Sequence, residues 1–97
     1  MIEYLYDCIR ATAGQDVTVT AIIEDASGTP ITDRCHIMLL DKNHDLIVMT
    51  DGTYLENGQW QFTIPAQSTK GKYGRYWYKI CTPDASLCFA QPIYLCV

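Results

Sequence analysis

Short runs of alternating apolar and polar residues recur along this chain and restrict the folds that it can adopt. In residues 17–25 nearly every second side chain is apolar, and in residues 59–64 the apolar positions are Trp60, Phe62 and Ile64. A period of two is typical of β-strands with one buried face, whereas an amphipathic helix repeats its apolar residues every three or four positions. No stretch shows a convincing helical period, so the sequence predicts an all-β domain.

Turn-forming residues separate these runs at short intervals. Asp51-Gly52 and Asn57-Gly58 follow each other closely, and such dipeptides favour the tight turns of β-hairpins. Pro30 closes another turn segment, because proline has no N–H to offer to a central strand ladder. Short strands joined by closely spaced turns indicate an antiparallel meander.

The predicted fold is a single domain, residues 1–97, with the architecture of an antiparallel β-sandwich of immunoglobulin-like type. We expect about seven or eight strands, and a small β-barrel is the alternative. The first strand should form a sheet edge, and the last should form an edge or a bulge because Pro92 interrupts it. Unbroken apolar runs in residues 35–40 and 46–50 predict that both faces of these two strands are partly buried. The expected strands are residues 2–9, 17–25, 35–40, 46–50, 59–64, 75–81 and 87–97.

Charge is unevenly distributed along the chain. Residues 1–69 carry three basic and ten acidic side chains, and residues 70–97 carry four basic and one acidic, so the two parts stand at −7 and +3. A basic edge suits docking onto an acidic protein or onto a second copy, although unrelated loops would give the same totals. The overall charge of −4 argues against a nucleic-acid-binding protein, because phosphate contacts need a net basic surface.

The N-terminal residues do not resemble a targeting signal. Residues 1–8 contain neither the basic segment nor the apolar core of a secretory signal, and no apolar run is long enough to span a membrane. We therefore expect no membrane partner, and a protein that is made in the cytosol and stays there or leaves it within an assembled particle.

A basic, glycine-containing loop at residues 70–74 leads directly into the aromatic strand at residues 75–81. Alternation places Arg75 and Trp77 on the face opposite the core. Aromatic and cationic groups together make effective anchors in protein interfaces, and an exposed ring can equally stack on a sugar. A terminal strand that covers Trp77 is the structural alternative. The predicted interface consists of Lys70, Lys72, Tyr73, Arg75 and Trp77.

Five cysteines leave at least one thiol without a disulfide partner. Cys81 and Cys88 flank a connection of six residues, so they could face each other at the base of a hairpin and form a disulfide. Free, buried thiols are the ordinary alternative in a reducing compartment.

No catalytic or metal-binding motif is present. Asp41, Asn43 and Asp45 match the first three ligand positions of a calcium loop, but Leu46 and Gly52 stand where the loop requires glycine and glutamate. The two histidines lack the spacing of a zinc site, and neither a nucleophile motif nor a phosphate-binding loop is readable. We expect no enzyme activity, no metal and no cofactor.

Three segments resemble the immunoglobulin-like domains of tailed-phage virion proteins, notably the N-terminal domain of baseplate upper proteins. Residues 14–33 contain a glycine-aspartate turn, an alternating strand and a D-x-x-G-x-P-I hairpin. Residues 58–65 contain G-x-W-x-F-x-I, and residues 74–78 contain G-x-Y-x-Y. The resemblance spans residues 14–81.

This resemblance implies a non-enzymatic building block of a phage or prophage particle, assembled in the bacterial cytoplasm and located in the virion. Its partners would be further copies, giving a homo-oligomer, or a second virion protein. The acidic counterpart of the basic interface would be residues 41–56 of the next subunit. A carbohydrate-binding or adhesion module of a larger surface protein, with a glycan as ligand, is the alternative from a different class.

Overall fold

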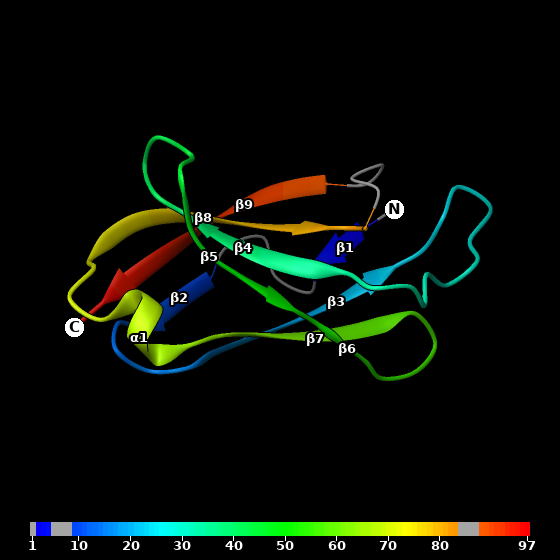
Figure 1. Cartoon of the computed structure of the whole chain (residues 1–97), viewed down its shortest axis with the longest axis horizontal. Helices are drawn as coiled ribbons and strands as arrows, with labels where there is room; N and C mark the ends of the chain where they lie inside the picture. Colours follow the sequence, from blue (N-terminus) through cyan, green and yellow to red (C-terminus); the bar gives the residue numbers. More distant parts are fainter. Residues whose placement is uncertain (1, 5–8, 84–87) are drawn as a thin grey trace.

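Two β-sheets pack face to face to form the domain (Figure 1). The computed structural model describes residues 2–4, 9–83 and 88–97. The elements are β1 (Ile2–Tyr4), β2 (Ile9–Thr12), β3 (Val17–Ile23), β4 (His36–Leu40), β5 (Leu46–Asp51), β6 (Thr53–Tyr54), β7 (Gln59–Ile64), α1 (Ala66–Thr69), β8 (Gly74–Cys81) and β9 (Cys88–Cys96). One sheet has the strand order β1-β3-β7-β6 and the other has the order β2-β9-β8-β4-β5. The predicted all-β, immunoglobulin-like sandwich is confirmed.

The core lies between the sheets and is filled by the inward-facing residues of the alternating strands. In β7 the burial alternates as predicted, with Trp60, Phe62 and Ile64 buried. The Trp60 indole N–H donates a hydrogen bond of 2.8 Å to the carbonyl of Ile31, so the only polar atom of this ring has a partner. The core cluster comprises Val17, Val19, Ala21, Ile23, Cys35, Ile37, Leu39, Trp60, Phe62, Ile64, Tyr78, Ile80, Ile93 and Leu95.

The N-terminal segment contributes to both sheets. β1 pairs antiparallel with β3, whereas β2 pairs parallel with β9. The single strand expected over residues 2–9 is therefore wrong, and residues 5–8 lie outside the described part of the chain. The chain passes from one sheet to the other between β1 and β2, and each of these strands forms an edge of its sheet. Local alternation of apolar and polar residues cannot reveal such a change of sheet.

The last strand does not form an edge, contrary to the sequence-based expectation. β9 lies between β8 and β2, and Pro92 is opposite Trp77 of β8. The described pairing with β2 begins at Ile93, one residue after the proline. Pro92 therefore lies just outside the segment of β9 that pairs with β2, so its missing N–H does not interrupt that pairing.

A short helix, α1, lies between β7 and the basic loop at residues 70–74, where the sequence predicted no helix. The buried Thr69 side chain closes this region: its hydroxyl donates to the carbonyl of Ala66 at 3.3 Å and accepts from the N–H of Gly14 at 2.9 Å. The Asp16 carboxylate also accepts a hydrogen bond of 2.8 Å from the N–H of Ala66. These contacts fix the start of the basic loop against the turn between β2 and β3.

Candidate protein-contact surface

The outer face of the five-stranded sheet carries the aromatic and basic side chains of β8. Tyr78 and Ile80 point into the core, so Arg75, Trp77 and Lys79 lie on the opposite face, as alternation predicted. Arg75 is exposed and Trp77 is half-buried. Leu40 of β4 is the register partner of Trp77, and the hairpin that follows β4 is therefore placed beside this ring.

The hairpin loop between β4 and β5 is held by one carboxylate. The Asp41 side chain accepts hydrogen bonds from the backbone N–H groups of Asn43 at 2.8 Å and of Asp45 at 2.9 Å. His44 has a φ of 64°, in the left-handed region that histidine adopts more readily than most residues other than glycine. This conformation brings the imidazole ring to the indole of Trp77, with 4.9 Å between ring centres and 28° between ring planes.

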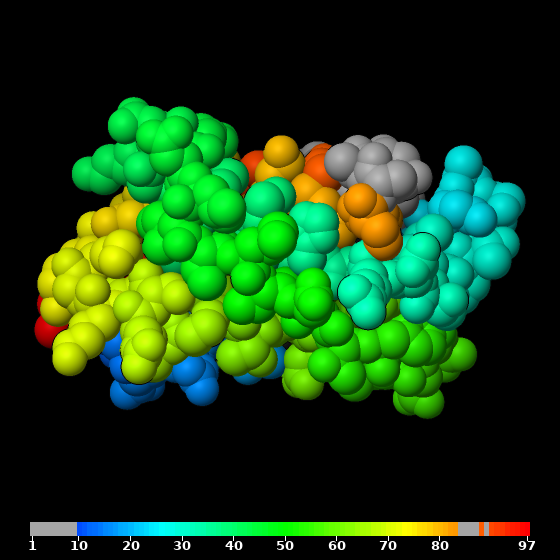
Figure 2. Space-filling view, in the orientation of Figure 1, coloured from blue at the N-terminus to red at the C-terminus, as the bar shows by residue number. Residues whose placement is uncertain are grey.

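Basic groups surround the Trp77 ring. The Arg75 guanidinium carbon lies 4.6 Å from the ring centre, a distance typical of a cation–π contact. A hollow of about 310 Å³ is lined by Lys42, His44, Arg75 and Trp77, and we call it the cationic hollow. Figure 2 shows the loop that carries Lys42 (green) beside the start of β8 (yellow to gold).

Among the residues that the structure describes, the cations of the hollow have no carboxylate partner. Within the described part of the chain, neither Lys42 nor Arg75 has a carboxylate within 4.0 Å. The Asp41 carboxylate, on the same hairpin, is used by the two backbone N–H groups of its own loop. A guanidinium that stacks on an aromatic ring keeps its in-plane N–H groups free, so Arg75 can still bind a carboxylate or another oxyanion.

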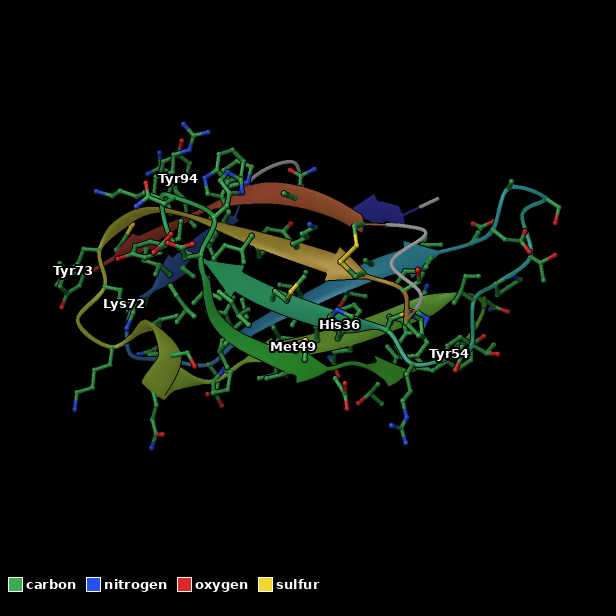
Figure 3. The ribbon with its side chains drawn as sticks, turned by 45° about the horizontal axis from the view of Figure 1, so that its top comes forward. His36, Met49, Tyr54, Lys72, Tyr73 and Tyr94 are labelled. Atoms are coloured by element: carbon green, nitrogen blue, oxygen red, sulfur yellow. A yellow bond between two sulfur atoms is a disulfide. The ribbon has the colours of Figure 1, made fainter. Side chains whose placement is uncertain are left out.

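A second cation–aromatic contact continues this arrangement across the sheet. The Arg10 guanidinium carbon of β2 lies 6.0 Å from the centre of the Tyr94 ring in β9. Arg10 and Arg75 are both register partners of Tyr94, one from each side. Figure 3 shows Tyr94 at the same end of the molecule as Tyr73. Cations and rings thus alternate across three neighbouring strands at this end.

Exposed apolar side chains lie beside the cationic hollow on the edge strand β5. Leu46 and Met49 are 58% and 54% exposed. The partial burial expected on both faces is therefore small for these two residues, because nothing in the described chain covers the outer face of β5. The outer face of the other sheet differs, since its exposed residues include Thr18, Gln61 and Thr63.

The structure separates the five residues of the predicted interface into two groups. Arg75 and Trp77 belong to the cationic hollow, whereas Lys70, Lys72 and Tyr73 lie in the loop before β8, where Tyr73 is 54% exposed and Lys72 is half-buried (Figure 3). The sequence did not identify Lys42 and His44 as members of the site. The sequence did indicate a hairpin loop at residues 41–45, which carries both residues. The position of this loop beside β8 follows from the pairing of β4 with β8, which are distant in the sequence.

The expected acidic segment, residues 41–56, is also divided. Asp41 and Asp45 lie on the hairpin of the cationic hollow in the same molecule, whereas Asp51 and Glu56 are exposed at and beyond the far end of β5. The carboxylates of residues 41–56 therefore lie in two separate places on the surface.

The cysteines differ in state. Cys81 and Cys88 form a disulfide across paired positions of β8 and β9, with 4.3 Å between their Cα atoms. Cys35 is buried and free, and Cys96 is exposed and free. Burial, assisted by the negative charge of Asp33, raises the pKa of the Cys35 thiol to about 11. Cys35 therefore behaves as a small core residue and not as a nucleophile.

Among residues 2–4, 9–83 and 88–97, no three His, Cys, Asp or Glu side chains are grouped in a way that could hold a metal ion. In the same residues no helix has the length and apolar character needed to cross a membrane. The hairpin that resembled a calcium loop uses its first carboxylate to bind its own backbone.

Comparison with known proteins identifies the fold. No protein-family model matches the chain, and no curated protein matches it in sequence. Its structure is similar to a segment of trypsin-activated alpha-2-macroglobulin from Escherichia coli, with a TM-score of 0.65, 18% identity, and coverage of 97% of this chain and 6% of that chain. A Salmonella alpha-2-macroglobulin mutant gives a TM-score of 0.66 and 15% identity, with coverage of 100% and 6%. Domain 1 of VCBP3 from Branchiostoma floridae gives a TM-score of 0.51 and 12% identity, with coverage of 100% and 93%.

The chain thus spans about 6% of the length of the macroglobulins that it resembles. At these identities the likeness establishes the immunoglobulin-like architecture alone. The similar structures named here are not phage or baseplate proteins, so the virion resemblance of the sequence is supported only at the level of the fold.

Proposed function

We propose that this domain is a non-enzymatic assembly module that joins protein subunits through the outer face of its five-stranded sheet. The observation that carries the proposal is the difference between the two outer faces. One presents the exposed Leu46 and Met49 next to the cationic hollow, whereas the other presents threonine and glutamine. Apolar residues bordered by arginine and aromatic side chains are characteristic of protein interfaces.

The physical basis is burial of the apolar residues combined with electrostatic guidance. Each of Leu46 and Met49 is roughly half exposed, so covering the rest of either side chain contributes about 1 kcal/mol. Arg75 and Lys42 bring no intramolecular carboxylate partner from the described chain. Their charge is therefore available to attract an acidic partner and to fix its orientation.

The finer proposal is that the assembly is a phage or prophage particle, with the protein made in the bacterial cytoplasm and located in the virion. Its support is the resemblance of residues 14–81 to virion immunoglobulin-like domains. The Cys81–Cys88 disulfide fits a particle that leaves the reducing cytosol after assembly.

The test is the mass of the protein by light scattering over a range of protein concentrations. We expect the wild-type chain to associate and the double variant Leu46→Lys/Met49→Lys to remain monomeric. Gln61→Lys is the matched control, because it adds a lysine at an exposed position of the other sheet. Association that is unaffected by the double variant, or abolished equally by the control, would contradict the proposal.

A glycan-binding function remains as the second candidate, and Tyr73 is the residue that favours it. Its ring is 54% exposed and accessible for stacking on a sugar. The Trp77 ring suits this role less well, because it already contacts His44 and Arg75. Glycan binding that is lost in Tyr73→Ala, by a protein that stays monomeric, would favour this function over assembly.

A further inference from the structure

The charged side chains are segregated along the long axis of the molecule, which measures 40 Å against 24 and 20 Å for the other two. We define the basic end as residues 41–45 and 70–75, which Figure 1 shows at the end of the molecule near the C-terminus. It carries four lysine and arginine residues and two aspartates, a formal charge of +2. The cationic hollow belongs to this end.

The acidic end consists of residues 24–35 and 51–56, at the opposite end in Figure 1. A hydrogen bond joins these two segments, because the N–H of Gly52 donates to the carbonyl of Cys35 at 2.9 Å. The residues that flank them are also bonded, since the N–H of Ile23 donates to the carbonyl of Gly58 at 2.8 Å. The two segments contain five carboxylates and one arginine, a formal charge of −4.

A rigid turn presents one carboxylate and one apolar side chain at the tip of the acidic end. Asn57 and Gly58 both have positive φ, 51° and 81°, and the N–H of Gln59 donates to the carbonyl of Glu56 at 2.8 Å. These are features of a type I′ turn. Glu56 is exposed, and the Leu55 side chain beside it is 46% exposed.

We propose that copies of this chain associate head to tail, with the turn of one copy seated in the cationic hollow of the next. The Glu56 carboxylate would bind Arg75 and Lys42, and Leu55 would pack on Leu46. The two sides are complementary in charge and each contains one exposed leucine. This proposal deepens the proposed assembly function and rests on it.

A head-to-tail contact uses two different surfaces, so every copy keeps one free hollow and one free turn. Chains or closed rings of copies are the expected products. Because both surfaces are exposed charges, association should weaken as the salt concentration rises. A symmetric contact, in which the same face meets itself, would not require Glu56.

The experiment mixes two charge-reversal variants and measures mass by native mass spectrometry and light scattering. Arg75→Glu retains the turn but loses the hollow, and Glu56→Arg retains the hollow but loses the turn. Each variant alone should be monomeric, with self-association weakened at least about thirtyfold. The mixture should regain association, because the turn of Arg75→Glu fits the hollow of Glu56→Arg and the two reversed charges attract each other at the second contact.

The matched control is Arg34→Glu, which makes the same charge change at the acidic end. It should associate at least as well as the wild type, so its dissociation would indicate a net-charge effect and overturn the proposal. Thermal melting of each variant verifies that the fold is retained.

Association of either single variant at wild-type strength, or a mixture that stays monomeric, would also overturn the head-to-tail contact. The assembly function would survive that result if Leu46→Lys/Met49→Lys still abolished association. A wild-type chain that is monomeric at every concentration and salt level would overturn both.

Discussion

Reduction of the Cys81–Cys88 disulfide should lower the free energy of unfolding by an amount that follows from the length of the loop. The two cysteines are seven residues apart, and closing a loop of this length removes chain entropy worth about 2.5 kcal/mol from the unfolded state. For a domain of this size, a loss of that magnitude corresponds to a decrease in melting temperature of roughly 10–20 °C.

The assay is thermal unfolding followed by circular dichroism, with and without a phosphine reductant, on protein whose disulfide content is verified by mass. Reduction removes no side-chain heavy atom, so the effect does not include the cost of a cavity that a substitution would create. Cys88→Ser is the control, and it should melt near the temperature of the reduced wild type and be insensitive to reductant. Equal melting temperatures for the oxidised and reduced wild-type protein would refute the reasoning.

Three further predictions concern the core and the free thiols. Gly52→Ala should destabilise the fold by about 1–3 kcal/mol, because an added Cβ would overlap the buried ring of Phe62. Chemical denaturation measures this loss, and combining the change with Phe62→Leu should reduce it. Iodoacetamide should label Cys96 in the native protein but not Cys35, and mass spectrometry should find equal labelling only after unfolding. The raised pKa of Cys35 favours the neutral thiol in the folded state, so its contribution to stability should be lost as pH rises from 9.0 to about 11. Comparison with Cys35→Ala across this window isolates that contribution.

Local pattern was sufficient to predict the strands whose two faces have different environments. β7 is an example, since its alternation and its flanking Asn57-Gly58 turn were both readable and both are present. Local pattern failed where the result depends on pairing between distant segments. The parallel pair of β2 with β9 and the inner position of β9 are set by strand order, which side-chain periodicity does not encode.

The candidate site shows the same division. Arg75 and Trp77 were predicted from alternation within one strand, and their outward position follows from it. Lys42 and His44 join them only because β4 is the neighbour of β8 in the sheet. Their membership of the site can therefore be recognised only once the strand order is known. The left-handed backbone of His44, which brings its ring to Trp77, was also not predictable from the sequence pattern.

The two tryptophans allow the position of the contact surface to be measured directly. Trp77 lies in the cationic hollow, whereas Trp60 is buried and its indole N–H is bonded to the carbonyl of Ile31. Two-dimensional ¹H–¹⁵N NMR spectra recorded at increasing protein concentration and at low salt report the two indole N–H groups separately. If subunits meet on the outer face of the five-stranded sheet, the Trp77 indole signal will shift with concentration while the Trp60 signal stays in place. Shifts confined to residues of the other outer face, such as Gln61, or no concentration dependence at all, would contradict the account.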